Sequence, residues 1–214
     1  TVLEPYQVEC VAKVMKAWRQ RFLIADDVGL GKTIEAGMVF KELDARGRAD
    51  RALIVCPAPL TFQWKQELME RFGADFVVVD SSTHNKIRRR LEDGVTPWEA
   101  LNRVITSVDF AKRKQVLNDL QRAQWDLVLI DEAHRSQEGR MGAAIRVPFR
   151  KPEDPDVEDA GEEDQDEEER IARIIREHDK NQLFVAFTAT PAPATLTLFG
   201  SPFDTYSEAE RSEE

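Results

Sequence analysis

Six short apolar runs, most of them separated by stretches of helical pattern, set the main constraint on the fold. The runs cover residues 21–25, 52–56, 76–79, 103–106, 127–130 and 183–187, and the helical patterns cover residues 7–20, 32–46, 60–72, 86–91 and 112–121. Strands that alternate with helices are typical of βαβ units with right-handed connections, and continuous apolar runs suit strands covered on both faces. The sequence therefore predicts an α/β fold of three layers around a central, mostly parallel sheet.

An acidic segment interrupts this pattern between residues 148 and 170. From Glu153 to Glu169 there are twelve acidic residues and no basic one. We expect a disordered insertion, because the segment has too few apolar side chains to offset the entropy of ordering it. An inert linker is the default interpretation, and a partner-binding or DNA-mimicking, autoinhibitory segment is the alternative. The segment from 153 to 169 therefore carries −12, and because the whole chain carries a formal charge of −10, the remaining residues sum to +2. A balance of this kind is compatible with a nucleic-acid partner.

Composition also indicates the cellular setting. Cys10 and Cys56 lie in apolar runs, which favours reduced thiols over a disulfide framework. No apolar run reaches the length of about 18 residues that a membrane span needs, and no signal-peptide pattern is visible at Thr1. The prediction is a cytoplasmic protein without a membrane partner.

A glycine-containing loop, ADDVGLGKT at residues 25–33, connects an apolar run to a helical pattern. Gly29 and Gly31 let backbone N–H groups approach a phosphate chain closely. Lys32 would then pair with the β and γ phosphates, and the Thr33 hydroxyl would bind Mg²⁺ at a helix N-terminus. The strict pattern has another glycine where this chain has Asp26, but the strand, loop and helix order is the required one. A purely structural glycine turn is the alternative.

Two carboxylates, Asp131 and Glu132, directly follow the apolar run 127–130. At the carboxyl end of a parallel strand they would face the crevice on which the glycine loop also opens. Asp131 is suited to hold Mg²⁺ through water, and Glu132 to polarise the attacking water in phosphoryl transfer. Two acids that merely end a strand are the alternative interpretation.

In this order the glycine loop, DEAH at residues 131–134 and TATP at 188–191 resemble the first RecA-like lobe of superfamily-two helicases and translocases, whose fold is a P-loop NTPase lobe. LEPYQ at 3–7, the glycine loop continued to Gly37, and the segment from LIVCPAPL at 53–60 to Gln63-Trp64 resemble the Snf-type DNA translocases. The bacterial members, including RNA-polymerase-recycling and antiphage-defence ATPases, are most similar. The resemblance covers about residues 1–145.

The resemblance implies an ATP- and Mg²⁺-dependent hydrolase that translocates on double-stranded DNA, and it implies a role for each matching residue. The nucleotide would be bound by Gln7, at the adenine edge, and by Asp27, Gly29, Leu30, Gly31, Lys32 and Thr33, and the metal by Thr33 and Asp131. Hydrolysis would involve Lys32, Asp131, Glu132 and His134, and Thr188 and Thr190 would couple it to movement. The DNA backbone would be contacted by Pro57, Gln63, Thr106 and Ser107.

The predicted organisation is a first lobe over residues 1–147, the acidic insertion over 148–170, the return of the lobe over 171–200 and a tail over 201–214. After Thr190 the chain is too short for a second RecA-like lobe, so we expect a fragment, or a half encoded separately, that needs such a lobe in cis or in trans for fast hydrolysis. The run that follows TATP is similar to the motor subunit of type I restriction enzymes, which indicates a second biological setting for the same chemistry. Two further hypotheses are a non-catalytic interaction module and an RNA helicase.

Two basic clusters, Lys86 to Arg90 and Lys112 to Lys114, fit contacts to phosphates, with a solvated helix face as the plain alternative. For Trp64, Trp98 and Trp125 we expect core packing rather than base stacking.

Overall fold

The computed structural model describes residues 4–16, 21–25, 31–131, 183–187 and 196. The elements are α1 (Pro5–Lys16), β1 (Arg21–Ile24), α2 (Lys32–Ala45), β2 (Ala52–Cys56), the 3-10 helix η1 (Ala58–Leu60), α3 (Thr61–Phe72), β3 (Val77–Val78), α4 (Ser81–Arg88), α5 (Pro97–Ala100), β4 (Arg103–Ser107), α6 (Val108–Ala111), α7 (Lys114–Arg122), β5 (Leu127–Asp131) and β6 (Leu183–Phe187). The predicted insertion at 148–170 and the tail at 201–214 lie outside the described residues.

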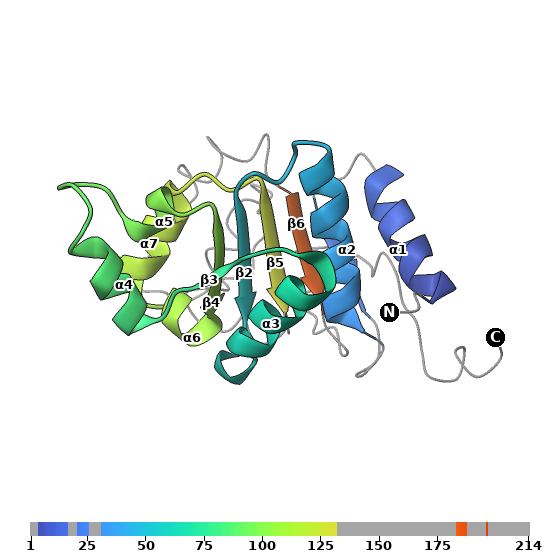
Figure 1. Cartoon of the computed structure of the whole chain (residues 1–214), viewed down its shortest axis with the longest axis horizontal. Coiled ribbons are helices and arrows are strands. Elements are labelled where there is room, and N and C mark those ends of the chain that lie inside the picture. The colour runs from blue at the N-terminus through green and yellow to red at the C-terminus, as the bar shows by residue number, and fades with distance from the viewer. Residues whose placement is uncertain (1–3, 17–20, 26–30, 132–182, 188–195, 197–214) are drawn as a thin grey trace, which may run out of the picture.

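All six strands belong to one sheet in the order β1-β6-β5-β2-β4-β3, and every neighbouring pair is parallel (Figure 1). Each strand was predicted from its apolar run, and the α/β class with a central parallel sheet is confirmed. Because all pairs are parallel, the carboxyl ends of the strands meet at one edge of the sheet. The loops that carry the candidate site residues leave from this edge.

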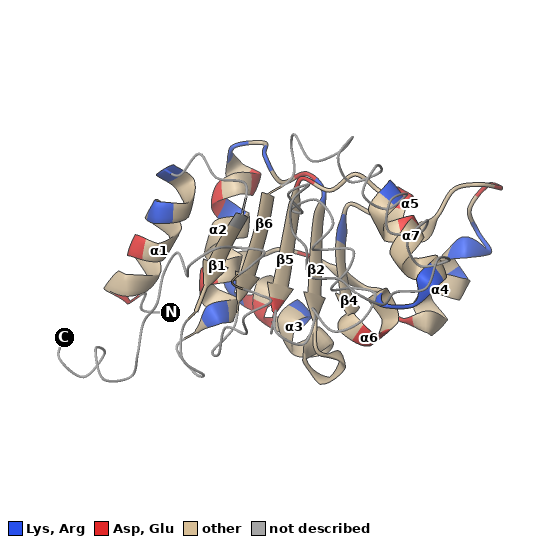
Figure 2. Ribbon diagram, turned by 180° about the vertical axis from the view of Figure 1, so that it is seen from behind, with Lys and Arg blue, Asp and Glu red and all other residues tan. Residues whose placement is uncertain are grey.

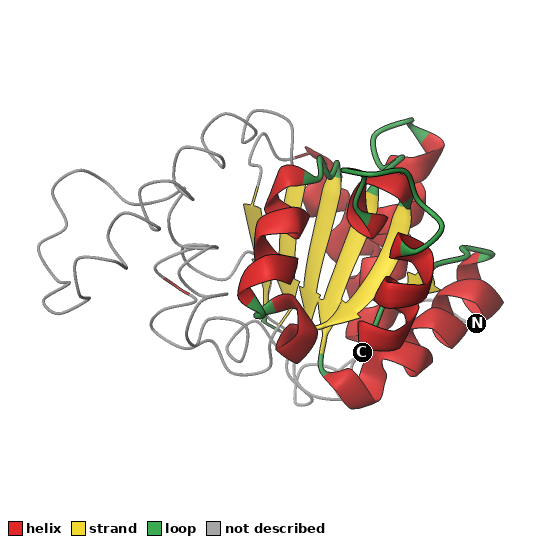
Figure 3. Ribbon diagram, turned by 90° about the vertical axis from the view of Figure 1, so that its left-hand side faces the viewer, coloured by secondary structure: helices red, strands yellow, loops and turns green. Residues whose placement is uncertain are grey.

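Helices cover both faces of the sheet, which gives the predicted three layers (Figure 3). Side chains of α1, α2 and α3 join one buried apolar cluster, and those of α5, α6 and α7 join a second. Strand residues alternate between the two clusters: Leu127 and Leu129 belong to the first, and Val128 and Ile130 to the second. A strand with apolar side chains on both faces reads as a continuous apolar run, which is why the pattern at 127–130 could be recognised.

Two short helices, α5 and α6, were not predicted. Each has four residues, so neither is long enough to show a helical period in the sequence. Both start at a hydroxyl side chain that accepts a hydrogen bond from a backbone amide: Thr96 from Glu99 N–H and Ser107 from Phe110 N–H. Capping of this kind is visible in sequence as T-x-x-E, the capping box at the start of α5.

The buried residues include all three tryptophans expected in the core. Trp64, Trp98 and Trp125 are at most 4% exposed, so core packing is confirmed and their rings are not available for stacking on bases. Cys10 and Cys56 are buried and are not joined in a disulfide, in agreement with the predicted thiols. Among the described residues, no helix has the length and apolar character needed to cross a membrane.

Gly37 marks a close approach between α2 and α3. A Cβ placed on this residue would lie 2.6 Å from both Cδ2 and Cζ of the Phe72 ring, closer than side chains pack. We therefore expect Gly37→Ala to lower the free energy of unfolding by about 1–3 kcal/mol, the usual effect of overpacking. Chemical denaturation measures this. The loss should shrink when Phe72 is also changed to Leu, and an undiminished loss in the double variant would contradict the Phe72 contact as its cause.

Candidate active site at the carboxyl edge of the sheet

The ends of β1 and β5 lie level with one another at the carboxyl edge. Ile24 at the end of β1 and Asp131 at the end of β5 have the same register partner, Phe187 of β6. Since adjacent strands are about 4.8 Å apart, the two backbone positions are separated by about 10 Å. The glycine loop departs one residue after Ile24, so the structure brings its start and the carboxylate of Asp131 to the same part of this edge.

The last glycine of the loop forms the start of α2. Gly31 is the N-cap residue and has a φ of 91°, a left-handed conformation that favours glycine. It has no side chain that could cap the helix, and Lys32 and Thr33 are the first two helical residues. The amides at the start of a helix, together with its dipole, form a site for an anion. The predicted phosphate-binding residues Gly31, Lys32 and Thr33 therefore occupy a position that fits a phosphate group.

Gln7 lies directly beside this turn. Its side chain is 3% exposed, and its Oε1 accepts a hydrogen bond of 3.2 Å from the Glu4 backbone amide. A Cβ on Gly31 would lie 2.6 Å from the Gln7 Nε2, so the carboxamide packs against the glycine backbone. The structure thus places α1 next to the end of the predicted phosphate loop. The contact of Gln7 with the adenine edge stays a prediction.

Asp131 is buried, and its carboxylate faces the layer that contains α3. The Trp64 indole N–H of α3 donates a hydrogen bond of 3.0 Å to the Asp131 Oδ2. Cys56, at the end of the neighbouring strand β2, also senses this carboxylate: burial, and secondly the charge of Asp131, raise the pKa of its thiol to about 12. The thiol is therefore protonated at neutral pH, and Trp64 fixes the orientation of the carboxylate.

The oxygen donors at this edge fit a magnesium ion bound together with phosphates. Mg²⁺ in such sites takes one or two protein oxygens and fills its remaining positions with phosphate oxygens and water. The Thr33 hydroxyl and the Asp131 carboxylate supply hard oxygen ligands of this kind. Within the described ranges no group of three or more His, Cys, Asp or Glu side chains is arranged to hold a metal ion.

The role of Trp64 was missed by sequence reasoning, which assigned it to the core alone. The available signal was chemical: a buried tryptophan N–H normally finds an acceptor. The acceptor could not be named, because Trp64 and Asp131 are 67 positions apart in the chain. In the structure Trp64 is both a core side chain and a positioning residue for Asp131.

We expect Trp64→Phe to lower the free energy of unfolding by about 1–3 kcal/mol and to weaken Mg-ATP binding, because a buried carboxylate loses its donor. Trp125→Phe is the matched control, since it also removes an indole N–H, one that donates to the Leu120 carbonyl. Denaturation and calorimetric titration of Mg-ATP separate the two: both variants should lose stability, and Trp64→Phe alone should lose affinity. Equal Mg-ATP affinity in the two variants would contradict a positioning role.

The residues predicted to contact DNA are divided between the edge and the interior. Pro57 follows Cys56, whose register partner is Ser107, so Pro57 and Ser107 are close together at the carboxyl edge. Gln63 is exposed on α3 and donates a hydrogen bond to Glu67. Thr106 differs: its side chain is fully buried, and its hydroxyl donates to the Val79 carbonyl at 2.9 Å. The structure gives Thr106 a role in packing, and its side chain does not reach the surface where DNA would bind.

Seven predicted site residues lie outside the described residues. They are Asp27, Gly29, Leu30, Glu132, His134, Thr188 and Thr190. Their assigned roles stay predictions.

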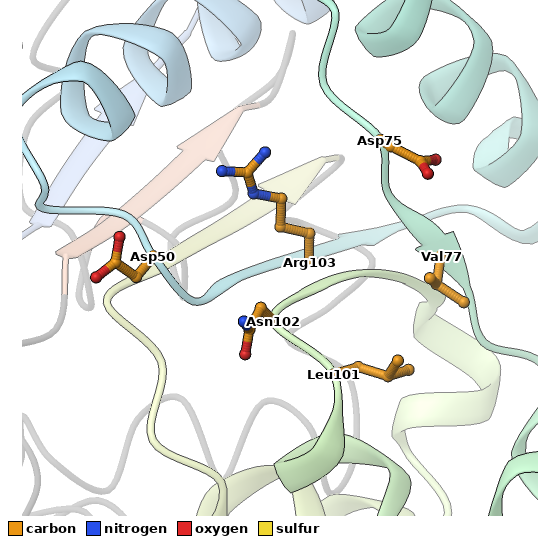
Figure 4. Close-up of a pocket in the computed structure, with 6 residues that line it drawn as sticks. All are labelled: Asp50, Asp75, Val77, Leu101, Asn102 and Arg103. Carbon is orange, nitrogen blue, oxygen red and sulfur yellow. The ribbon is translucent and has the colours of Figure 1, made fainter.

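A separate pocket of about 490 Å³ lies at the opposite, amino edge of the sheet (Figure 4). Its lining includes Asp50, Asp75, Asn102 and Arg103. The Arg103 guanidinium forms an ion pair of 2.7 Å with Asp44, and Asp75 lies 3.9 Å from the Lys65 ammonium. None of the predicted site residues lines this pocket, and the ion pair between Arg103 and Asp44 joins β4 to α2.

Comparison with protein families and curated sequences gives consistent matches. Residues 1–193 match the family model described as type III restriction enzyme, res subunit. The RNA polymerase-associated protein RapA of Serratia proteamaculans (strain 568) is 43% identical over 133 residues, which are 62% of this chain and 13% of that protein. RapA of Yersinia enterocolitica is 44% identical over the same share of each chain. The chain thus spans about one eighth of the length of these relatives.

Solved structures share the fold. The Sulfolobus solfataricus SWI2/SNF2 ATPase core in complex with dsDNA superposes with a TM-score of 0.60 and 19% identity, covering 94% of this chain and 36% of that one. The Pyrococcus furiosus Hef helicase domain gives a TM-score of 0.65 and 18% identity, covering 98% of this chain and 39% of that one. At these identities the likeness concerns the fold, and this chain corresponds to part of each of the two solved chains.

Proposed function

The chain belongs to the family described as type III restriction enzyme, res subunit, and from that premise we propose that it is the ATP-binding lobe of a Mg²⁺-dependent ATPase that moves along double-stranded DNA. The resemblance to a RecA-like lobe of superfamily-two helicases is confirmed by the family match, the RapA relatives and the fold. Beyond this resemblance, we propose that the chain hydrolyses ATP, that it moves along DNA, and that single residues have the roles given below.

The observation that carries the proposal is the level arrangement of the two strand ends. Ile24 and Asp131 share one register partner, and the helix that follows the glycine loop begins with Lys32 and Thr33. A phosphate chain held at the N-terminus of α2 would therefore lie within reach of the Asp131 carboxylate. If the glycine turn were only structural, there would be no reason for an acidic residue, Asp131, to lie level with the end of β1 on the second strand along.

The residues of this chain divide the chemistry among them. The start of α2 binds the phosphates, with the Lys32 ammonium offsetting negative charge on the β and γ groups. Thr33 and Asp131 would hold Mg²⁺, which, when bound, supplies positive charge at the γ-phosphate. Trp64 orients Asp131 through its hydrogen bond. Glu132, the next residue in the chain, is assigned to polarise the attacking water.

The proposed track is the DNA backbone, contacted from Pro57, Gln63 and Ser107. Pro57 directly follows β2, and Ser107 is the last residue of the adjacent strand β4. Both lie at the carboxyl edge, beside the half formed by β1, β6 and β5, where the nucleotide is proposed to bind. A relative of this fold is described in complex with dsDNA, and RapA is described as associated with RNA polymerase. These descriptions support DNA as the partner of this chain. We further propose that the chain works in the cytoplasm.

A second RecA-like lobe is part of the proposal, on the same polypeptide or on another. Such a lobe supplies an arginine that stabilises the charge of the transition state in related phosphoryl-transfer enzymes. The chain covers 36% of the SWI2/SNF2 ATPase core, which leaves room for that lobe in a complete motor. We therefore expect slow hydrolysis from this lobe alone and faster hydrolysis once the second lobe is present.

Two measurements on the chain test the proposal. Calorimetric titration should show Mg-ATP binding, and fluorescence anisotropy should show binding to duplex DNA stronger than to single-stranded RNA of equal length. Absence of Mg-ATP binding would leave a non-catalytic interaction module on this fold. Binding of RNA alone would replace the DNA track with an RNA one.

A further inference from the structure

Two basic segments that are 22 residues apart in the chain form one surface in the structure. The first comprises Lys86 and Arg88 in the last turn of α4 with Arg89 and Arg90 directly after it, and the second comprises Lys112, Arg113 and Lys114, from the end of α6 to the first residue of α7. Figure 2 shows the basic residues of α4 beside those that follow α6. Six of the seven side chains are exposed, and Lys112 is half-buried. We call these seven residues the basic flank.

Aromatic packing joins the two segments. The Phe110 ring of α6 lies 5.8 Å from the imidazole of His84 on α4, and the Arg113 guanidinium lies over the same ring at 5.0 Å. Trp98 of α5 packs against both His84 and Phe110. Burial lowers the pKa of His84, so the imidazole is neutral at pH 7 and acts as a packing group. The basic flank therefore rests on a fixed aromatic support.

The position of the second segment opposes the helix dipole. Arg113 is the N-cap residue of α7 and Lys114 its first residue, and the first turn contains no acidic side chain. Cations are unfavourable at a helix N-terminus, where the dipole is positive. Lys86 and Arg88 lie in the last turn of α4, where the helix dipole favours cations. At the start of α7 the dipole disfavours them, so stabilisation of that helix does not explain Arg113 and Lys114.

Several cations elsewhere in the described structure form ion pairs, and four cations of the basic flank differ from them. Lys13, Lys41, Arg46, Lys65 and Arg103 each form an ion pair with a carboxylate. Among the described residues no such pair involves Lys86, Arg89, Arg90 or Lys112. The acidic side chains nearby in the chain are Glu92, Asp93, Asp109 and Asp119, fewer than the seven cations. The flank keeps a net positive charge.

The basic flank is connected to the carboxyl edge through α6. The Ser107 hydroxyl accepts a hydrogen bond of 3.2 Å from the Phe110 amide, so Ser107 and the aromatic support belong to the same turn of chain. Ser107 is also a residue assigned to the DNA backbone. A polyanion that touches Ser107 can therefore continue over α6 toward α7 and α4 without crossing the nucleotide-binding half of the edge.

We propose that the basic flank is a second contact surface for the phosphate backbone of duplex DNA, which extends the track from Ser107 along α6, α7 and α4. The inference rests on the proposed function, because it assumes that DNA lies at Ser107. Contacts from lysine and arginine to phosphates carry no sequence information, which is what movement along DNA of any sequence requires.

The test compares two double variants with the same loss of charge. Arg89→Gln with Lys112→Gln removes one cation from each half of the flank. The control, Lys16→Gln with Arg48→Gln, removes two exposed cations away from the flank. Lys16 is the last residue of α1, and Arg48 follows α2. Affinity for a duplex of mixed sequence is measured by anisotropy at several salt concentrations, with the melting temperature as a check on folding and Mg-ATP titration as a check on the nucleotide site.

The flank variant should bind duplex DNA more weakly, and the slope of log K against log salt should become shallower by about 2, since each lost phosphate contact changes it by about 0.9. The slope of the control variant should stay near that of the unmodified chain, and both should bind Mg-ATP normally. Equal slopes in the two variants would overturn the flank while leaving the proposed function in place. Failure of the unmodified chain to bind duplex DNA would remove both the DNA track and the flank.

Discussion

Lys32→Ala is expected to abolish the heat of Mg-ATP binding in calorimetric titration and to reduce ATP hydrolysis at least about 100-fold, measured with the second lobe present. Lys32 is the first residue of α2, directly after the left-handed glycine turn. Its ammonium is the cation that the sequence places closest to the phosphates, since residues 25–31 include no other basic side chain. Loss of a preorganised charge at a phosphoryl group is among the largest effects that one side chain produces in such enzymes.

Lys41→Ala is the matched control for this variant. Lys41 lies on the same helix, nine residues further along, and pairs with Asp44 at 3.6 Å. Its removal should leave Mg-ATP binding unchanged and alter stability by less than about 1 kcal/mol, as for an exposed ion pair. Heats of Mg-ATP binding that are equal in the Lys32 and Lys41 variants would remove the nucleotide site from the start of α2.

Asp131→Asn is expected to reduce Mg²⁺-dependent hydrolysis about 100- to 1,000-fold, because it removes the buried negative charge assigned to the metal. The fold should survive, since the amide oxygen of asparagine can still accept the hydrogen bond from the Trp64 indole. The expected result is therefore a catalytic loss without a comparable loss of stability. Rates at saturating ATP over a range of Mg²⁺ concentrations, together with denaturation curves, measure both quantities.

Asp126→Asn provides the comparison for Asp131→Asn. Asp126 precedes the same strand at its amino end and accepts a hydrogen bond from the Arg51 amide at 2.8 Å. Changing it removes a carboxylate next to β5 without touching the carboxyl edge. If this variant lost hydrolysis to the same degree as Asp131→Asn, the effect could not be assigned to metal binding at the carboxyl edge.

The sequence was sufficient for the strands because burial on both faces leaves a signal in short segments. All six strands were predicted within two residues at either end, but the strand order that gives Ile24 and Asp131 the same partner in β6 was not predicted. Helix boundaries were less accurate where capping residues determine them. The helix predicted at 86–91 forms instead at Ser81–Arg88, because the Asp80 carboxylate accepts the Thr83 amide and starts the helix earlier.

Contacts between distant segments were beyond the sequence. The bond from Trp64 to Asp131 and the packing of Gln7 against Gly31 depend on how α3 and α1 lie on the sheet, which no local pattern specifies. Thr106 shows the reverse problem. The resemblance implied that Thr106 contacts the DNA backbone, but alternation along β4 turns its side chain inward, to the Val79 carbonyl, while the next residue, Ser107, caps α6.

The position of β6 has a consequence for how the chain is made. β6 is the last described strand in sequence, yet it lies between β1 and β5 and is the only described partner of β1. On the ribosome, therefore, the segments that carry the glycine turn and the acid emerge early but cannot be set side by side until residue 187 has left the exit tunnel. A nascent chain that has not reached this point lacks the strand between β1 and β5, so we expect the proposed nucleotide site to form only after residue 187 has emerged.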